Sequence, residues 1–288
     1  MPNFVKIKNK INNFNKSLSI DGDKSLSIRW ALLASQSLKK CRSSNLLYSE
    51  DVMSTLNCLK KLGVKIKISK NFCEIIGLGL NGFRYKDNQI LDAGNSGTLG
   101  RLILGLLVDT PHQIKLIGDK SLSKRDFKRI SDPLSRFGAT FKLKKNKNLP
   151  LTITGSDKLK PIRYVEKKGS AQCKSSVIFA AMRTNGTTVI KAKKSRNHTE
   201  ILCKHLNLPI VINKKKNYDY IKIKKINKIN KINYNIPSDI SSSAFFIVLV
   251  ALTKNSQLTI KNVNINPSRI GVITILRKMG IKINFKNK

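Results

Sequence analysis

The sequence repeats one pattern four times. Stretches rich in small residues each open an apolar helical run: GDKSLSIRWALLASQ, GNSGTLGRLILGLLV, GSAQCKSSVIFAAM and SDISSSAFFIVLVAL. A second helical pattern then ends near glycine or asparagine, in CLKKLGVKIKI, PLSRFGATFKL, LCKHLNLPIVI and LRKMGIKINF. Self-similarity at a fixed period marks a chain built from repeated folding units. The chain is therefore constrained to fold as four copies of one unit.

The spacing inside each copy is nearly constant. From Ser25, Ser96, Ser170 and Ser241 to Gly63, Gly138, Asn207 and Gly280 the chain advances 38, 42, 37 and 39 residues. β-prone stretches such as HQIKLIG, TTVIKA and QLTIKNV lie between these points. The closing glycine or asparagine is typical of a left-handed helix C-cap, and the alternating KIKI, TFKL, PIVI and KINF that follow indicate strands. We predict an α/β unit of helix, strand, helix and strand, with a further strand such as LPLTITG after the second copy.

The string GDKSLS occurs twice, beginning at Gly22 and at Gly118. Ser25 lies 38 residues before its closing glycine, whereas Ser121 lies 17 residues before Gly138. We therefore predict two different sites. The first should cap the helix that opens copy one, and the second should lie in the turn between the middle strand and the second helix of copy two.

The helix openings suit an anion. A helix N-terminus offers unpaired N–H groups and a partial positive charge. Lys24 and Ser25 lie at such an opening, and Arg29 follows one turn later on the same face,. An ordinary helix N-cap followed by charged residues that only face solvent would have the same sequence pattern. If the N-termini of the equivalent helices in the four copies met around one axis, they would together form a binding site for phosphate or carboxylate groups.

Composition narrows the possible partners. The 288 residues are 40% hydrophobic and carry a net charge of +40, but lysine alternates with asparagine and isoleucine throughout the chain. With 6% aromatic residues there is no evident stacking platform for single strands,. We interpret the charge as a general basic bias together with sites for small phosphorylated ligands. A basic RNA-binding protein is an alternative, and we predict no nucleic-acid partner.

Cysteine, histidine and hydropathy patterns indicate an intracellular protein without metal. The five cysteines form no C-x-x-C pair, the three histidines have no ligand spacing, and the longest apolar stretch is AFFIVLVAL,. MPNFVKIKNK lacks the apolar core of a secretory signal,. We expect reduced thiols, no metal site, no membrane partner and a cytoplasmic location.

The motifs resemble those of the enolpyruvyl transferases, and within them the 5-enolpyruvylshikimate-3-phosphate synthase family. The resemblance runs through SIDGDKSLSIRWALLA, LDAGNSGTLGRL, GDKSLSKRDF, DPLSRFGA, GSAQCKSSVIFAA, SRNHTEIL, IPSDISSSAFFIVLVAL and NINPSRIGVITILRKMGI. It implies an α/β (α+β) fold of repeated helix–strand units, the inside-out α/β barrel. Residues 20–236 would form a complete lobe of three units, and residues 1–19 and 237–288 an incomplete lobe.

The resemblance also implies a reaction. The family transfers the enolpyruvyl group of phosphoenolpyruvate to the 5-hydroxyl of shikimate 3-phosphate through a tetrahedral intermediate, and releases inorganic phosphate. No metal or organic cofactor takes part. The expected partners are these two small molecules, and we expect a monomer.

Site residues follow from the resemblance position by position. Shikimate 3-phosphate would be held by Lys24, Ser25, Arg29, Ser170, Ala171, Gln172 and Arg196. Phosphoenolpyruvate would be held by Lys24, Asn95, Gly97, Arg125 and Gln172. Some relatives carry alanine at the position of Gly97, so mimics of phosphoenolpyruvate such as glyphosate should meet no methyl barrier here.

The chain also departs from the family pattern. Asp21 and Asp126 stand where proline is usual, and Ser238 stands where glycine is usual. A carboxylate at Asp126 would compete with substrate for Arg125. The expected acid–base carboxylates and the R-V-K-E-[ST]-D-R and H-R segments do not occur, so we expect a C-terminally truncated chain whose catalytic residues lie beyond residue 288.

Three alternatives to that enzyme stay open. One is a truncated remnant that binds shikimate 3-phosphate without efficient turnover. A second is a UDP-N-acetylglucosamine enolpyruvyl transferase, which the DKS-x-S-x-R and RNHTE forms disfavour. The third is the RNA-binding protein named above.

Overall fold

A computed structural model describes residues 11–286, and the chain divides into two compact units. The first, which we call the continuous unit, is Lys24–Ile236. The second, the terminal unit, is formed by the residues up to Asp23 and from Pro237 onward. Each unit is described by itself.

The continuous unit contains three four-stranded sheets of one design. The first is β13 (Asn233–Asn235), β2 (Lys40–Ser44), β4 (Phe72–Ile76) and β3 (Lys65–Ser69). The second is β5 (Gln89–Asp92), β6 (Ile114–Ile117), β8 (Asn148–Thr154) and β7 (Thr140–Lys144). The third is β9 (Arg163–Glu166), β10 (Thr187–Lys193), β12 (Tyr218–Lys224) and β11 (Ile210–Lys214). In every sheet the first pair is parallel and the next two pairs are antiparallel, so the sheets are structural copies.

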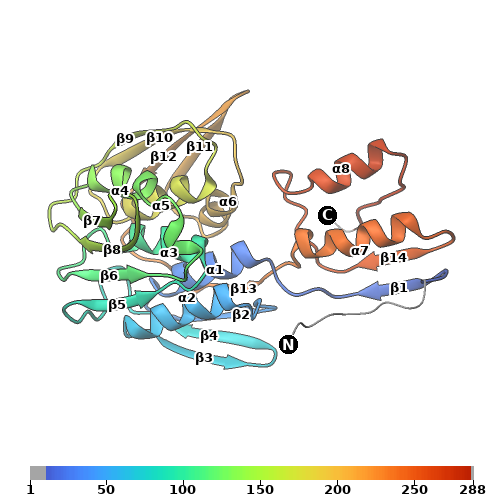
Figure 1. Cartoon of the computed structure of the whole chain (residues 1–288), viewed down its shortest axis with the longest axis horizontal. Coiled ribbons are helices and arrows are strands. Elements are labelled where there is room, and N and C mark those ends of the chain that lie inside the picture. The colour runs from blue at the N-terminus through green and yellow to red at the C-terminus, as the bar shows by residue number, and fades with distance from the viewer. Residues whose placement is uncertain (1–10, 287–288) are drawn as a thin grey trace. The chain divides into compact units, whose positions relative to one another are not determined.

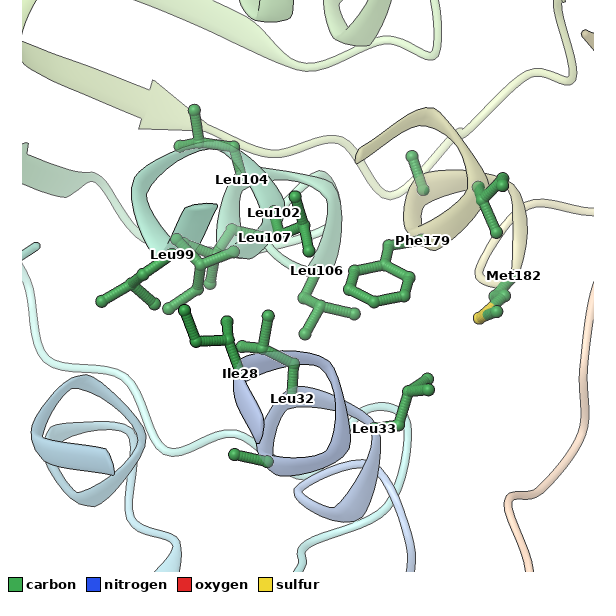
Figure 2. Packing of buried hydrophobic residues seen from close by; sticks show 14 of the residues in the cluster. Ile28, Leu32, Leu33, Leu99, Leu102, Leu104, Leu106, Leu107, Phe179 and Met182 are labelled. Atoms are coloured by element: carbon green, nitrogen blue, oxygen red, sulfur yellow. The ribbon is translucent and has the colours of Figure 1, made fainter. Parts of the chain in front are cut away.

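Three opening helices form the core of this unit: α1 (Lys24–Ala34), α3 (Gly97–Leu106) and α5 (Ala171–Ala181). Apolar side chains cover most of their surfaces, as expected of helices buried on all sides. Figure 2 shows Leu32, Leu106 and Phe179 meeting between the three helices. A Cβ at Gly105 would lie 2.2 Å from the Ser176 carbonyl oxygen, so glycine is what allows α3 and α5 to approach closely,.

Each opening helix is followed by a strand and a second helix, as predicted. The second helices are α2 (Glu50–Lys61), α4 (Lys128–Ser135) and α6 (His198–His205), and a 3₁₀ turn, η1 (Leu122–Lys124), precedes α4. The closing residues have the predicted left-handed conformation, with φ of 88° at Gly63, 123° at Gly138, 53° at Asn207 and 89° at Gly280. The repeated unit is therefore confirmed at the residues that define it.

One predicted strand is wrong. KIKI and TFKL lie in β3 and β7, and PIVI lies in β11 except for Pro209, but no strand is assigned to residues 281–286, which contain KINF. A strand needs a hydrogen-bonded neighbour. Among residues 11–286, none pairs with this segment,.

The terminal unit contains β1 (Asn15–Leu18), α7 (Ile240–Leu252), β14 (Gln257–Ile260) and α8 (Gly271–Lys278). β1 and β14 pair in parallel and lie side by side in Figure 1. α7 is apolar like the core helices, yet only Ile240 and Ser243 are buried, and Phe245 and Leu252 are 80% and 81% exposed. No helix within residues 11–286 has the length and apolar character needed to cross a bilayer.

Strand pairing around α1 and α7 differs from that around the other two opening helices, and each of these pairs lies within one unit. The strands that flank α3, β5 and β6, pair with each other, as do β9 and β10 around α5. β1 precedes α1 but pairs with β14, and β13 precedes α7 but pairs with β2. The Ser238 hydroxyl donates to the Ile20 carbonyl at 2.6 Å and to the Lys261 carbonyl at 3.2 Å, so serine in place of glycine has its own hydrogen bonds.

Candidate active site

Five helices of the continuous unit begin at one cleft of about 590 Å³. The residues that line it are Lys24, Ser25, Arg29, Asp51, Asn95, Gly97, Thr98, Arg125, Gly169, Ser170, Ala171, Gln172, Ser195, Arg196 and His198. Four are cationic and one, Asp51, is acidic. Unpaired N–H groups and positive side chains at the same place make this a cleft for anions.

Every binding residue expected from the sequence lies in this lining. Asn95 and Gly97 come from the start of α3, Arg125 from the turn before α4, and Arg196 from the turn before α6. Asp51, Thr98, Gly169, Ser195 and His198 were not expected there. The last four lie inside motifs quoted above, but Asp51 carries no such signal because it reaches the cleft from the first turn of α2.

The helix openings are capped in two ways. Ser96 accepts a hydrogen bond from the Leu99 N–H at 3.2 Å, and Ser170 accepts one from the Cys173 N–H at 3.3 Å, as N-cap serines do,. The prediction that Ser25 caps α1 is wrong. α1 begins at Lys24, so Ser25 is its second residue and Asp23 occupies the position before the helix.

The second GDKSLS supports Arg125 without entering the cleft. Its Asp119 accepts from Asn95 Nδ2 at 2.8 Å and from the Leu122 N–H at 2.6 Å. Asn95 Oδ1 in turn accepts from Arg125 Nη2 at 3.1 Å. The first GDKSLS supplies Lys24 and Ser25 to the lining. The prediction of two different sites is confirmed.

Asp126 does not contact Arg125 through its carboxylate. Its Oδ1 accepts from the Lys128 N–H at 2.8 Å, which satisfies an N–H group at the start of α4,. The Arg125 guanidinium donates to Asn95 instead. One oxygen of the Asp126 carboxylate is thus bound by the backbone of the next helix, and competition with substrate for Arg125 stays a prediction.

Gln172 is held by two side chains of α3. Its Oε1 accepts from Arg101 Nη1, and its Nε2 donates to Thr98 Oγ1 at 3.0 Å. Burial lowers the pKa of the Arg101 guanidinium,. The interaction with Cys173 opposes this shift, and the charges of Arg129 and Arg125 add to it. Arg101 fixes the orientation of an amide that has a second N–H without a partner among the described residues.

Two cations of the lining are already engaged. Arg29 is 3% exposed, and its guanidinium donates to Thr199 Oγ1 at 2.7 Å, to the Ser25 carbonyl at 3.0 Å and to Ser175 Oγ at 3.2 Å. Lys24 Nζ lies 3.2 Å from Asp51 Oδ2, with 45% of the lysine side chain exposed. A ligand would displace Asp51 from Lys24 more easily than it would displace the partners of Arg29.

A larger cavity of about 1060 Å³ lies at the other ends of the opening helices. Its lining includes Leu38, Asp109 and Arg183, which follow the C-termini of α1, α3 and α5, and it contains none of the expected site residues. Helix C-termini carry partial negative charge, which disfavours anions. The smaller cleft is therefore the candidate active site.

Repeated helix–strand units whose opening helices meet at a cationic cleft define the class of enolpyruvyl transferases. The family model described as EPSP synthase (3-phosphoshikimate 1-carboxyvinyltransferase) matches residues 8–288. The chain belongs to the EPSP synthase family.

Relatives and solved structures agree with this assignment. The chain is 40% identical over 272 residues to a 3-phosphoshikimate 1-carboxyvinyltransferase of Caldicellulosiruptor saccharolyticus, covering 94% of this chain and 62% of that one. It is 37% identical over 286 residues to one of Streptococcus mutans, covering 99% and 66%. The structure of EPSP synthase from Acinetobacter baumannii superposes with a TM-score of 0.85 at 34% identity, covering 93% and 60%. The chain thus spans about 62% of the length of the first of these relatives.

Proposed function

We propose that the cleft binds shikimate 3-phosphate and phosphoenolpyruvate, and that it serves the transfer of the enolpyruvyl group to the 5-hydroxyl of shikimate 3-phosphate. The main support for the proposal is that the binding residues expected from the sequence lie together in the folded chain. Ten residues expected from the family motifs, spread from Lys24 to Arg196, line one cleft at the beginnings of five helices.

The cleft lining suits both ligands. Lys24 and Ser25 line the same cavity as the α5 opening, Ser170 to Gln172, which suits a phosphate ester,. Arg125, aligned by Asn95, offers a planar guanidinium for a carboxylate or phosphate,. The resemblance supplies the order of bonds: the 5-hydroxyl oxygen loses its proton and bonds to C2 of phosphoenolpyruvate while C3 gains a proton, and the C2–O bond to phosphate then breaks as C3 loses a proton and the C2–C3 double bond re-forms. We assign binding roles to these residues and the proton transfers to none of them.

The first experiment is calorimetric titration of the chain with shikimate 3-phosphate, alone and with phosphoenolpyruvate, with unphosphorylated shikimate as the ligand control. The repeated GDKSLS provides a matched pair of variants. Lys24→Met should weaken shikimate 3-phosphate binding by about tenfold or more, because one charge-assisted contact is lost. Lys120→Met, at the same position of the other copy and outside the cleft lining, should change it less than about twofold.

The outcomes separate the alternatives. No binding of shikimate 3-phosphate, or equal loss in both variants, would overturn the proposed function. Binding of both ligands without release of inorganic phosphate would favour the ligand-binding remnant. Retention of RNA that persists in high salt would favour the RNA-binding alternative.

Location and assembly are part of the same proposal. The five cysteines are free and buried, which supports a reducing compartment such as the cytoplasm,. A monomer that acts on small molecules, without nucleic acid, membrane or cofactor, stays a prediction.

A further inference from the structure

A buried ion pair lies directly behind the cleft. Lys174 Nζ is 2.5 Å from Glu200 Oε1, and the two side chains are 0% and 3% exposed. Neither Lys174 Nζ nor Glu200 Oε2 has a hydrogen-bond partner among the residues that the structure describes, so the two charges meet as an ion pair at contact distance and not as a hydrogen bond of ordinary geometry. None of the roles proposed above uses this pair.

The pair connects two helix beginnings that line the cleft. Lys174 is one turn into α5, and its N–H donates to the carbonyl of the N-cap Ser170 at 3.1 Å. Glu200 is in the first turn of α6, four residues after Arg196 and two after His198. The ion pair therefore ties the Ser170–Gln172 opening to the turn that carries Arg196.

A neutral hydrogen bond already joins the same helices, since Ser175 Oγ of α5 lies 2.6 Å from Thr199 Oγ1 of α6. The Arg29 guanidinium of α1 donates to both hydroxyls. A buried ion pair often adds no net stability over apolar side chains of similar size, because both charges lose their hydration. Here one carboxylate oxygen also lacks a partner, so stability alone does not account for the charges.

We propose that Lys174 and Glu200 form a positioning pair, which fixes the start of α6 against α5 and thereby holds Arg196 and His198 at the cleft. The attraction of two buried charges at contact distance favours one relative position of the two helix starts, whereas apolar side chains would let α6 rotate or slide between similar packings. In this inference, the choice of shikimate 3-phosphate as the ligand rests on the proposed function. The effect of the Lys174–Glu200 pair on the order of α6 is independent of it.

The test replaces the pair with apolar side chains in the double variant Lys174→Met/Glu200→Leu. We expect an unfolding temperature equal to or above that of the wild type. Amide exchange at the start of α6, from Ile201 onward, should be faster by about an order of magnitude, because local opening of that turn becomes easier. The dissociation constant for shikimate 3-phosphate should rise by about tenfold, as for a misplaced binding group.

Two further variants complete the design. The charge-keeping variant Lys174→Arg/Glu200→Asp retains a buried cation beside a buried anion and should keep most of the affinity and the amide protection. If the apolar double variant does not fold, this variant is compared with Glu200→Gln, which leaves the Lys174 charge without a counter-charge, for the same two readouts. The matched control is Asp109→Leu/Arg183→Met, which removes an ion pair at the other ends of the helices and should leave both readouts unchanged.

The inference fails if the folded double variant keeps wild-type exchange at α6, or if the control variant changes α6 exchange equally. Failure of the proposed function looks different. The wild type would not bind shikimate 3-phosphate, while exchange at α6 would still separate the paired from the unpaired variants.

Discussion

Gly97 lies where the cleft backbone approaches a guanidinium. A Cβ at this position would be 2.8 Å from Arg125 Nη1, closer than real Cβ contacts. The absence of that methyl group is what lets Arg125 bond to Asn95 beside the helix opening. The space beside Gly97 is occupied by the Arg125 guanidinium, so a methyl group at this position would act by displacing Arg125.

We predict that Gly97→Ala weakens phosphoenolpyruvate and glyphosate while leaving shikimate 3-phosphate nearly unchanged. Loss of one aligned charge-assisted contact corresponds to about 1.5–3 kcal/mol, or about tenfold or more in affinity. Fluorescence titration of each ligand measures the effect. Gly271→Ala is the control, because its Cβ would meet nothing within 4 Å. Unchanged glyphosate affinity in Gly97→Ala would contradict this account of Arg125.

At the level of residues, local patterns were informative and long-range partners were not. Gly63, Gly138, Asn207 and Gly280 could be predicted as left-handed caps because the requirement is local to one turn,. Arg101 could not be predicted as the partner of Gln172, because the two are 71 residues apart and meet only when α3 packs on α5.

At the level of elements, the three core helices are joined at both ends. Beyond their C-termini, Arg183 donates to Asp109 Oδ1 at 2.8 Å, to Gln36 Oε1 at 2.8 Å and to Asn81 Oδ1 at 3.4 Å. Gln36 follows α1, Asp109 follows α3 and Arg183 follows α5. One guanidinium therefore holds together the helix ends farthest from the cleft.

We predict that Arg183→Met lowers the free energy of unfolding by about 2–4 kcal/mol, because three partners lose their donor and Asp109 keeps a partly buried charge. Urea unfolding followed by circular dichroism measures this. Arg136→Met, at an exposed arginine, should cost less than about 0.5 kcal/mol,. Since α1 is about 16 Å long, ligand affinity at the cleft should not change in Arg183→Met. Equal stability of the two variants would contradict the role of Arg183.

Strand predictions succeeded where a partner was available. The closing strands of three copies form because each pairs with the following strand of its own sheet, as β3 does with β4. The fourth copy has the same alternation of polar and apolar residues in KINF, but this alternation does not provide a neighbouring strand to pair with. The pairing of β1 with β14 and of β13 with β2 could likewise not be predicted from local sequence patterns. The paired residues of β13 and β2, for example, are 191 residues apart in the sequence.

At the scale of the whole molecule, buried thiols link stability to pH. Burial is the main cause that raises the pKa of Cys58 from 9.0 to about 12 and that of Cys73 from 9.0 to about 12. The unfolded chain releases these protons above pH 9, whereas the folded chain keeps them. Their contribution is fully present below pH 9 and is lost as the pH rises toward 12.

We predict that the free energy of unfolding falls above pH 9 by about 1.4 kcal/mol per pH unit for each such thiol. Urea unfolding at pH 8, 9 and 10 with a reductant measures the slope. The Cys58→Ala/Cys73→Ala variant should have a shallower slope over the same range, although it starts from a lower stability because of the two small cavities. An identical slope in the variant would exclude these thiols as the cause.

The pairing of β13 with β2 has a consequence for the order of synthesis. β2 is made early, but the strand that covers its outer edge ends at Asn235, so that edge stays open until most of the chain has left the ribosome. An uncovered strand edge is a template for pairing with other chains. During translation, this edge of β2 is therefore open to pairing with other chains until β13 emerges, and chaperone contact should be most useful in that interval.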